Sequence, residues 1–248
     1  MDQLTFFIQP ILNIYQDDRC LWFSIYAVLF SIISYIILAL PYLIIDHLKI
    51  TRFNKYRIET KTNKNLGHKS IFLFILNSIL LFCLSVIFWP LLSLSQINLS
   101  PFPGFIISIL QILFFLMLDD LLFYFYHRHL HSPFLYHKVH RIHHSYRHSS
   151  VLAAIHFHPI EYILISLSFY SGPLLLGANV WVFYMWIFLR QWIGVSGHCG
   201  YKFPWEWQKH IPFHSGNQFH YLHHKYPNRN FGLFFDLWDR IFSTRFDS

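Results

Sequence analysis

The stretch LDDLLFYFYHRHLHSPFLYHKVHRIHHSY, residues 118–146, decides the fold of this chain, because it joins the end of an apolar segment to a run of histidines. Asp120, Tyr124, His127 and His131 follow one another at offsets of four, three and four residues. Such offsets place side chains on one face of a helix. We therefore predict a helix that leaves an apolar environment and carries a polar stripe ending in two histidines.

Histidines in this stretch and near the C-terminus form three spaced groups. The groups are His127 and His131; His140, His143 and His144; and His220, His223 and His224. Positions three and four residues apart share a helix face, and imidazole is the commonest metal-donating side chain. Eight imidazoles beside a bilayer would be costly to desolvate without partners. The three groups together therefore predict a metal centre.

Composition places the chain in a membrane, because 54% of its residues are hydrophobic, 21% aromatic and only 12% charged. Residues 21–45, 71–94 and 104–118 are uncharged apolar segments, of which the first two are long enough to span a bilayer and the third is completed by the helix that follows. Residues 162–189 contain Gly172-Pro173 and Gly177 and predict a tight helical hairpin or two short half-membrane helices. The expected fold is all-α: a membrane bundle of about four embedded helices or hairpins with a cytoplasmic, histidine-rich helical cap.

Charge indicates how the bundle is oriented. With these crossings, residues 46–70, 127–161 and 190–248 share one face and hold 18 of the 19 Lys and Arg residues, all except Arg19. The positive-inside rule makes that face cytoplasmic. Anionic headgroups account for the net charge of +7, so no nucleic-acid partner is expected. We divide the chain into membrane anchor helices with a basic loop, residues 1–103, and a catalytic unit, residues 104–248.

The number of histidines bears on the metal. Eight or more are too many for one ion, because a zinc site needs three or four protein ligands, so two ions fit better. Nitrogen donors alone suit iron, zinc, copper or nickel; a redox pair beside a lipid-accessible bundle favours iron. A membrane zinc hydrolase stays open as an alternative. A divalent-metal transporter is less favoured, because the first two spans hold no ionisable residue.

Several motifs together resemble the fatty acid hydroxylase and sterol desaturase superfamily, which includes methylsterol oxidases and cholesterol 25-hydroxylases. They are the 118–146 stretch, HPIE at 158–161, GHCGYKFPW, HYLHHKYPNRNFG and LWDRIFSTR, and they cover about residues 115–246. The resemblance implies an integral membrane, non-haem enzyme with two iron ions. Such an enzyme uses O2 as co-substrate and external electrons to hydroxylate, oxidise or desaturate a lipid, such as a sterol or fatty acyl chain.

The resemblance also assigns individual residues. The three histidine groups match the three histidine boxes of the family and are the expected iron ligands, which zinc could also occupy. His198 matches a further ligand, and His158 is a candidate ligand or support. Glu161, in the same His-Pro-x-Glu motif, could likewise bind metal directly or support a ligand from behind, whereas Asp120 and Asp239 are expected to orient histidine N–H groups. Ser243 replaces a glycine that is usual in the family, and His210 and His214 are expected not to bind metal.

The partners expected are the membrane, a lipid substrate and a separate electron-donor protein, either a b-type cytochrome or a ferredoxin with its reductase. The active site would face the cytoplasm, from the endoplasmic reticulum in a eukaryote or from the cytoplasmic membrane in a bacterium. The motifs do not choose between substrates, or between hydroxylation and desaturation.

Overall fold

The computed structural model describes residues 9, 13–59, 66–214 and 216–246. Within these ranges the chain is helical, with only isolated β-bridges, which confirms the predicted all-α class. In chain order the elements are α2 (Asp18–Cys20), η1 (Leu21–Tyr26), α3 (Ala27–His47), η2 (Thr51–Tyr56), α4 (Gly67–Ile87), α5 (Trp89–Leu92), α6 (Phe105–Leu130), α7 (Pro133–Leu135), η3 (Tyr136–His140), η4 (His143–Ser145), η5 (Val151–Ile155), α8 (Pro159–Leu175), α9 (Val180–His198), η6 (Trp207–His210), α10 (Asn217–Lys225) and α11 (Leu237–Ile241).

Three helices of the described chain are long and apolar enough to cross a membrane: Asp18–His47, Gly67–Ile87 and Phe105–Leu130. They correspond to the three predicted spans. The second ends at Ile87, earlier than the predicted residue 94, because Pro90 lies in the first turn of a separate short helix, α5. A proline has no backbone N–H and cannot continue the preceding helix.

The predicted hairpin is formed by α8 and α9. Its turn uses Gly177, which has a positive φ of 60° and lies so close to Gln96 that a side chain would collide with it. The Asn179 side chain then accepts a hydrogen bond from the Trp181 backbone N–H and caps α9. Glycine and a capping side chain thus reverse the chain within four residues.

Gly172-Pro173 does not break α8 but lies inside it. A Cβ atom at Gly172 would lie 2.8 Å from Cδ1 and 2.9 Å from Cα of Phe115. The glycine therefore allows α8 to approach α6 closely, and these two helices make the most extensive helix contact in the bundle. Close packing here fixes α8 against the helix that carries the first two histidines.

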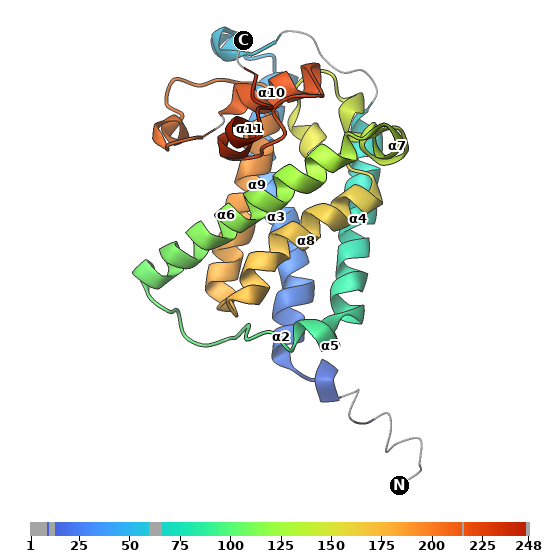
Figure 1. The fold of residues 1–248 in the computed structure, drawn as a ribbon, viewed down its shortest axis with the longest axis vertical. Coiled ribbons are helices and arrows are strands. Elements are labelled where there is room, and N and C mark those ends of the chain that lie inside the picture. The colour runs from blue at the N-terminus through green and yellow to red at the C-terminus, as the bar shows by residue number, and fades with distance from the viewer. Residues whose placement is uncertain (1–8, 10–12, 60–65, 215, 247–248) are drawn as a thin grey trace.

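Figure 1 shows how the helices are arranged: α3, α4 and α9 run along the long axis, and α6 and α8 cross them obliquely. The short elements α7, α10 and α11 gather at one end, while α5 and the N-terminal side lie at the other. The three histidine-bearing segments therefore share one end, as the sequence predicted. That this end is cytoplasmic stays a prediction, and so does a domain boundary at residue 103.

Candidate metal centre

Nine histidines form two adjoining groups. Within each group, the candidate ligand nitrogens all lie within 4.8 Å of one another. The first group contains His127, His131, His140, His144 and His223; the second contains His143, His198, His220 and His224. All are buried except His131 and His224, which are partly exposed. The structure thus brings together the eight histidines of the three sequence groups and adds His198.

Distances between Nε2 atoms test whether metal ions fit. In the first group, His127 and His140 are 3.1 Å apart and His131 and His223 are 3.1 Å apart. In the second, His198 lies 2.9 Å from His220. With metal–nitrogen bonds of about 2.1 Å, neighbouring ligand atoms are separated by about 3.0 Å at right angles and about 3.4 Å in a tetrahedron. The nitrogens therefore have the spacing of ligands around two ions.

Helix α6 supplies the first pair. Asp120, Tyr124 and His127 are buried along one stripe of this helix, as their spacing predicted, and His131 follows at its C-terminal end. The next three histidines are carried by the wide turn η3 and the tight turn η4, in place of a regular helix. This change of pitch buries His140, His143 and His144 together, whereas neighbouring His137 is exposed.

The remaining four candidate ligands come from the C-terminal half. His198 is the last residue of α9, and α10 carries the other three at its buried face and end. Neighbouring residues of a helix point about 100° apart. His223 accordingly joins the first group and His224 the second.

Backbone carbonyl oxygens orient several rings by hydrogen bonds to Nδ1, on the side of the ring away from Nε2. The Nδ1–H groups of His127, His198, His223 and His224 donate to the carbonyl oxygens of Phe231, Gly194, Arg229 and Tyr146, at 2.7–3.0 Å. A carbonyl oxygen can only accept, so Nδ1 carries the proton and the Nε2 lone pair is bare. Bare lone pairs about 3 Å apart cannot bond to one another. They need a cation between them, which is what a metal site supplies.

Glu161 holds a fifth ring: its Oε1 accepts from His140 Nδ1 at 2.8 Å, and both side chains are nearly inaccessible to solvent. The other two predicted carboxylates act differently, and the expectation that they bind histidine N–H groups directly is wrong. Asp120 accepts from the backbone N–H of Phe234, and Asp239 from that of Phe231. They fix the loop whose Phe231 carbonyl accepts the hydrogen bond from His127. The two carboxylates therefore orient the His127 ring indirectly, through the backbone of this loop.

Burial sets the charge of these rings. It lowers the pKa of His140, His143 and His220 well below the usual value, and neighbouring histidines lower them further. The pKa of His224 falls to about 3 for the same reason, desolvation by burial. The rings are therefore neutral at pH 7, which is the protonation state that binds a metal.

The other three histidines that the sequence analysis named, His158, His210 and His214, stay outside both groups. His158, a candidate ligand from the sequence, instead caps α8, where its Nδ1 accepts from the Ile160 backbone N–H. His214 packs on Phe234 and accepts from the Gly216 backbone N–H. His210 is exposed.

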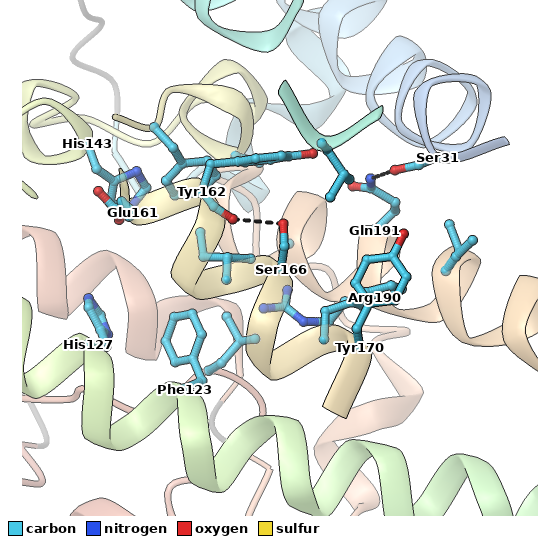
Figure 2. A pocket seen from close by; sticks show the side chains of 18 of the residues that line it. Ser31, Phe123, His127, His143, Glu161, Tyr162, Ser166, Tyr170, Arg190 and Gln191 are labelled. Carbon is cyan, nitrogen blue, oxygen red and sulfur yellow. Dashed lines mark hydrogen bonds between the residues drawn. The ribbon is translucent and has the colours of Figure 1, made fainter. Parts of the chain in front are cut away.

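A cavity begins at the histidines and extends between α3, α6, α8 and α9 (Figure 2). Its volume of about 110 Å³ exceeds the roughly 10–15 Å³ that one water requires. His127, His143 and Glu161 line one end, and mostly apolar and aromatic side chains line its walls, among them Phe123 and Phe169. The metal groups thus face an apolar space inside the bundle.

The sequence did not reveal Arg190 as part of this cavity. It was counted among the basic residues of the cytoplasmic face, but it lies within α9, lines the cavity and donates from Nε to Asp119 Oδ2 at 2.6 Å. The side chains of Asp119 and Arg190 are only 1% and 12% exposed. The carbonyls that hold the histidines were also missed, because a backbone carbonyl has no sequence signal.

Helical spans and this histidine cluster define an integral membrane protein with a candidate two-metal centre. Comparison with known proteins gives its family. The family model described as fatty acid hydroxylase matches residues 112–244, more than half of the chain. The chain therefore belongs to the fatty acid hydroxylase family, as its motifs predicted, and is a membrane enzyme of that family.

Individual relatives agree with this assignment. Methylsterol monooxygenase 2-2 of Arabidopsis thaliana is 32% identical over 200 residues, which are 77% of this chain and 74% of that protein. A very-long-chain aldehyde decarbonylase of Oryza sativa subsp. japonica is 30% identical over 217 residues, 83% of this chain and 78% of that protein. A putative methylsterol monooxygenase of Dictyostelium discoideum is 31% identical over 211 residues, with the same two shares. No solved structure matches the chain.

Proposed function

We propose that this protein is an O2-dependent di-iron enzyme that hydroxylates, oxidises or desaturates a lipid, either a sterol or a fatty acyl chain. The observation that carries the proposal is the pair of histidine groups whose bare Nε2 atoms converge at ligand spacing beside an apolar cavity. The similarity to methylsterol monooxygenases and to an aldehyde decarbonylase supports lipid oxidation chemistry.

Each part of the site has a task in this proposal. The nine histidines would hold two iron ions, which supply the activation of O2 toward a C–H bond. The carbonyls and Glu161 keep the Nε2 atoms of five of these rings free of a proton. The apolar walls of the cavity would bind the hydrocarbon part of the substrate and exclude water from the reacting carbon. Placement of the substrate then selects which hydrogens react, and therefore whether an alcohol or an alkene forms.

The proposal includes a direction and partners. Hydroxylation consumes two electrons and two protons per O2. One oxygen atom becomes the hydroxyl group of the product and the other is released as water. We infer that a separate electron-donor protein, a b-type cytochrome or a ferredoxin with reductase, delivers them at the basic end of the bundle. By the positive-inside rule that end faces the cytoplasm.

Metal analysis tests the proposal most directly. Protein purified anaerobically from cells grown on iron-57 should contain close to two irons per chain, and Mössbauer spectra should show a coupled pair after exposure to O2. His143→Ala should lower the iron content, whereas His210→Ala, outside both groups, should not. Stoichiometric zinc with no oxygen consumption would instead favour the zinc hydrolase.

A further inference from the structure

Four polar side chains line the part of the cavity away from His143 and Glu161. Figure 2 shows Ser31, Tyr170 and Gln191 at that end, and the Arg190 guanidinium between them and Phe123. We call these four residues the polar floor. On α9, Arg190 and Gln191 precede His198 by eight and seven residues. At 1.5 Å per helical residue, the backbone of these two residues lies about 10–12 Å along α9 from that of His198.

The polar floor lies near the middle of the membrane. Ser31 accepts a hydrogen bond from Gln191 and is the fourteenth of the 30 residues in the first spanning helix. Asp119, the partner of Arg190, is the fifteenth of the 26 residues in α6. Ionisable side chains at such depth are costly, and they mark substrate or ion pathways far more often than they serve packing.

Much of the hydrogen-bonding capacity of this floor is unused. A guanidinium has five N–H donors, yet Arg190 makes one hydrogen bond to the described residues, through Nε to Asp119. Gln191 donates from Nε2 to Ser31, and its Oε1 has no hydrogen-bond partner among the described residues. The floor therefore offers both donors and an acceptor to a group inside the cavity.

The charges of the floor restrict that group. Asp119 balances Arg190, and the second carboxylate oxygen of Asp119 is buried without a hydrogen bond. An anionic ligand would have to approach this carboxylate in a medium of low dielectric constant, where like charges repel strongly. A hydroxyl group is neutral and both donates and accepts, which matches Arg190 together with Gln191.

We propose that the polar floor binds the hydroxyl group of an uncharged lipid alcohol. The floor then selects hydroxylated lipids over hydrocarbons and over fatty acids. Combined with the proposed function, on which this second statement rests, the position of that hydroxyl sets which carbon of the alcohol faces the histidines. Arg190 and Gln191 act as specificity determinants, and Asp119 positions Arg190.

Equilibrium binding of tritiated lipids to the full-length, iron-loaded protein in nanodiscs tests this directly. The probes are two pairs that differ by a hydroxyl, hexadecan-1-ol with hexadecane and cholesterol with cholestane, together with hexadecanoic acid. In at least one pair the alcohol should bind about tenfold or more tighter than its hydrocarbon, the effect of one or more satisfied buried hydrogen bonds. Hexadecanoic acid should bind more weakly than hexadecan-1-ol.

Two independent variants identify the residues. Gln191→Leu should reduce the alcohol preference to less than about threefold. So should the double variant Asp119→Leu/Arg190→Met, which replaces the ion pair by apolar side chains and leaves no buried charge unpaired. Tyr184→Phe is the matched control: it removes another hydrogen bond from α9 to the first spanning helix, to the Trp22 carbonyl, outside this cavity. It should leave the preference unchanged.

Equal binding of alcohol and hydrocarbon by the wild type would overturn the proposal. So would failure of both alcohols to bind, preference for the acid, or an unchanged preference in both floor variants. The same measurement on metal-free protein separates the two proposals. If the protein holds no iron but still prefers the alcohol through Arg190 and Gln191, the di-iron function fails and the hydroxyl site stands.

Discussion

Removal of the Glu161 carboxylate should weaken iron binding at the first histidine group. The His140 Nδ1–Glu161 Oε1 hydrogen bond is 2.8 Å long, and its side chains are 1% and 3% exposed, so bulk solvent does not supply another acceptor. Glu161→Ala leaves a buried N–H unsatisfied and frees the ring to turn, a loss of about 1–3 kcal/mol. Groups that orient metal-bound histidines typically change metal affinity by about 10–100-fold, which is about 1.4–2.7 kcal/mol.

Competition with a chelator of known affinity, under anaerobic conditions, measures this effect. Glu161→Ala should lose iron at chelator concentrations about 10–100-fold lower than the wild type, and Mössbauer spectra should assign the loss to one of the two ions. Glu161→Gln is the matched control, because its side-chain carbonyl still accepts from Nδ1–H; its affinity should stay within about tenfold of the wild type. Wild-type affinity in Glu161→Ala, or equal losses in both variants, would refute the reasoning.

Three further predictions concern pH, packing and the identity of the ligands. Burial lowers the pKa of the six histidines of the second and third boxes, so below about pH 6.5 the unfolded chain binds protons that the folded rings do not. Iron retention and the Tm should therefore fall as the pH decreases from 7 to 5, and a rising Tm would contradict this. Gly172→Ala should destabilise the bundle by about 1–3 kcal/mol, because the added methyl group would lie 2.9 Å from the Phe115 backbone. The loss should appear as a lower Tm in detergent. An unchanged Tm would show that α6 and α8 can separate freely. His198→Ala should lower the iron content toward one ion per chain, whereas His158→Ala should retain two ions per chain. The opposite result would reverse the ligand assignment made from the geometry.

Local patterns made much of this protein predictable. Uncharged apolar segments of about twenty residues specify spanning helices, because the bilayer fixes their length. Offsets of three and four residues specify a shared helix face, so the buried stripe of Asp120, Tyr124 and His127 could be read directly. Gly177 marks the reversal between α8 and α9, since glycine readily takes the positive φ of that turn, whereas the Asn179 cap of α9 is evident only from the structure.

Contacts between distant segments were not predictable in the same way. Asp120 and Asp239 have the composition of ligand-orienting residues, but they accept hydrogen bonds from backbone amides of the 231–235 loop. Arg190 is a basic residue near the start of a polar C-terminal region, and only its packing against Asp119 shows that it lies in the cavity. The partners of Arg190 and Asp120 are 71 and 114 residues away in the chain, in directions that no local pattern encodes.

The sequence by itself determined that nine histidines would lie at one end of a membrane bundle. Only the tertiary structure decided which of them share a site. The sequence boxes do not correspond to the two groups: His143 and His144 are adjacent in the chain but belong to different groups, as do His223 and His224. Successive residues of a helical turn diverge by about 100°, so the second and third boxes each serve both groups, whereas His127 and His131 both belong to the first. The packing of α6, α9 and α10 determines where the rings meet.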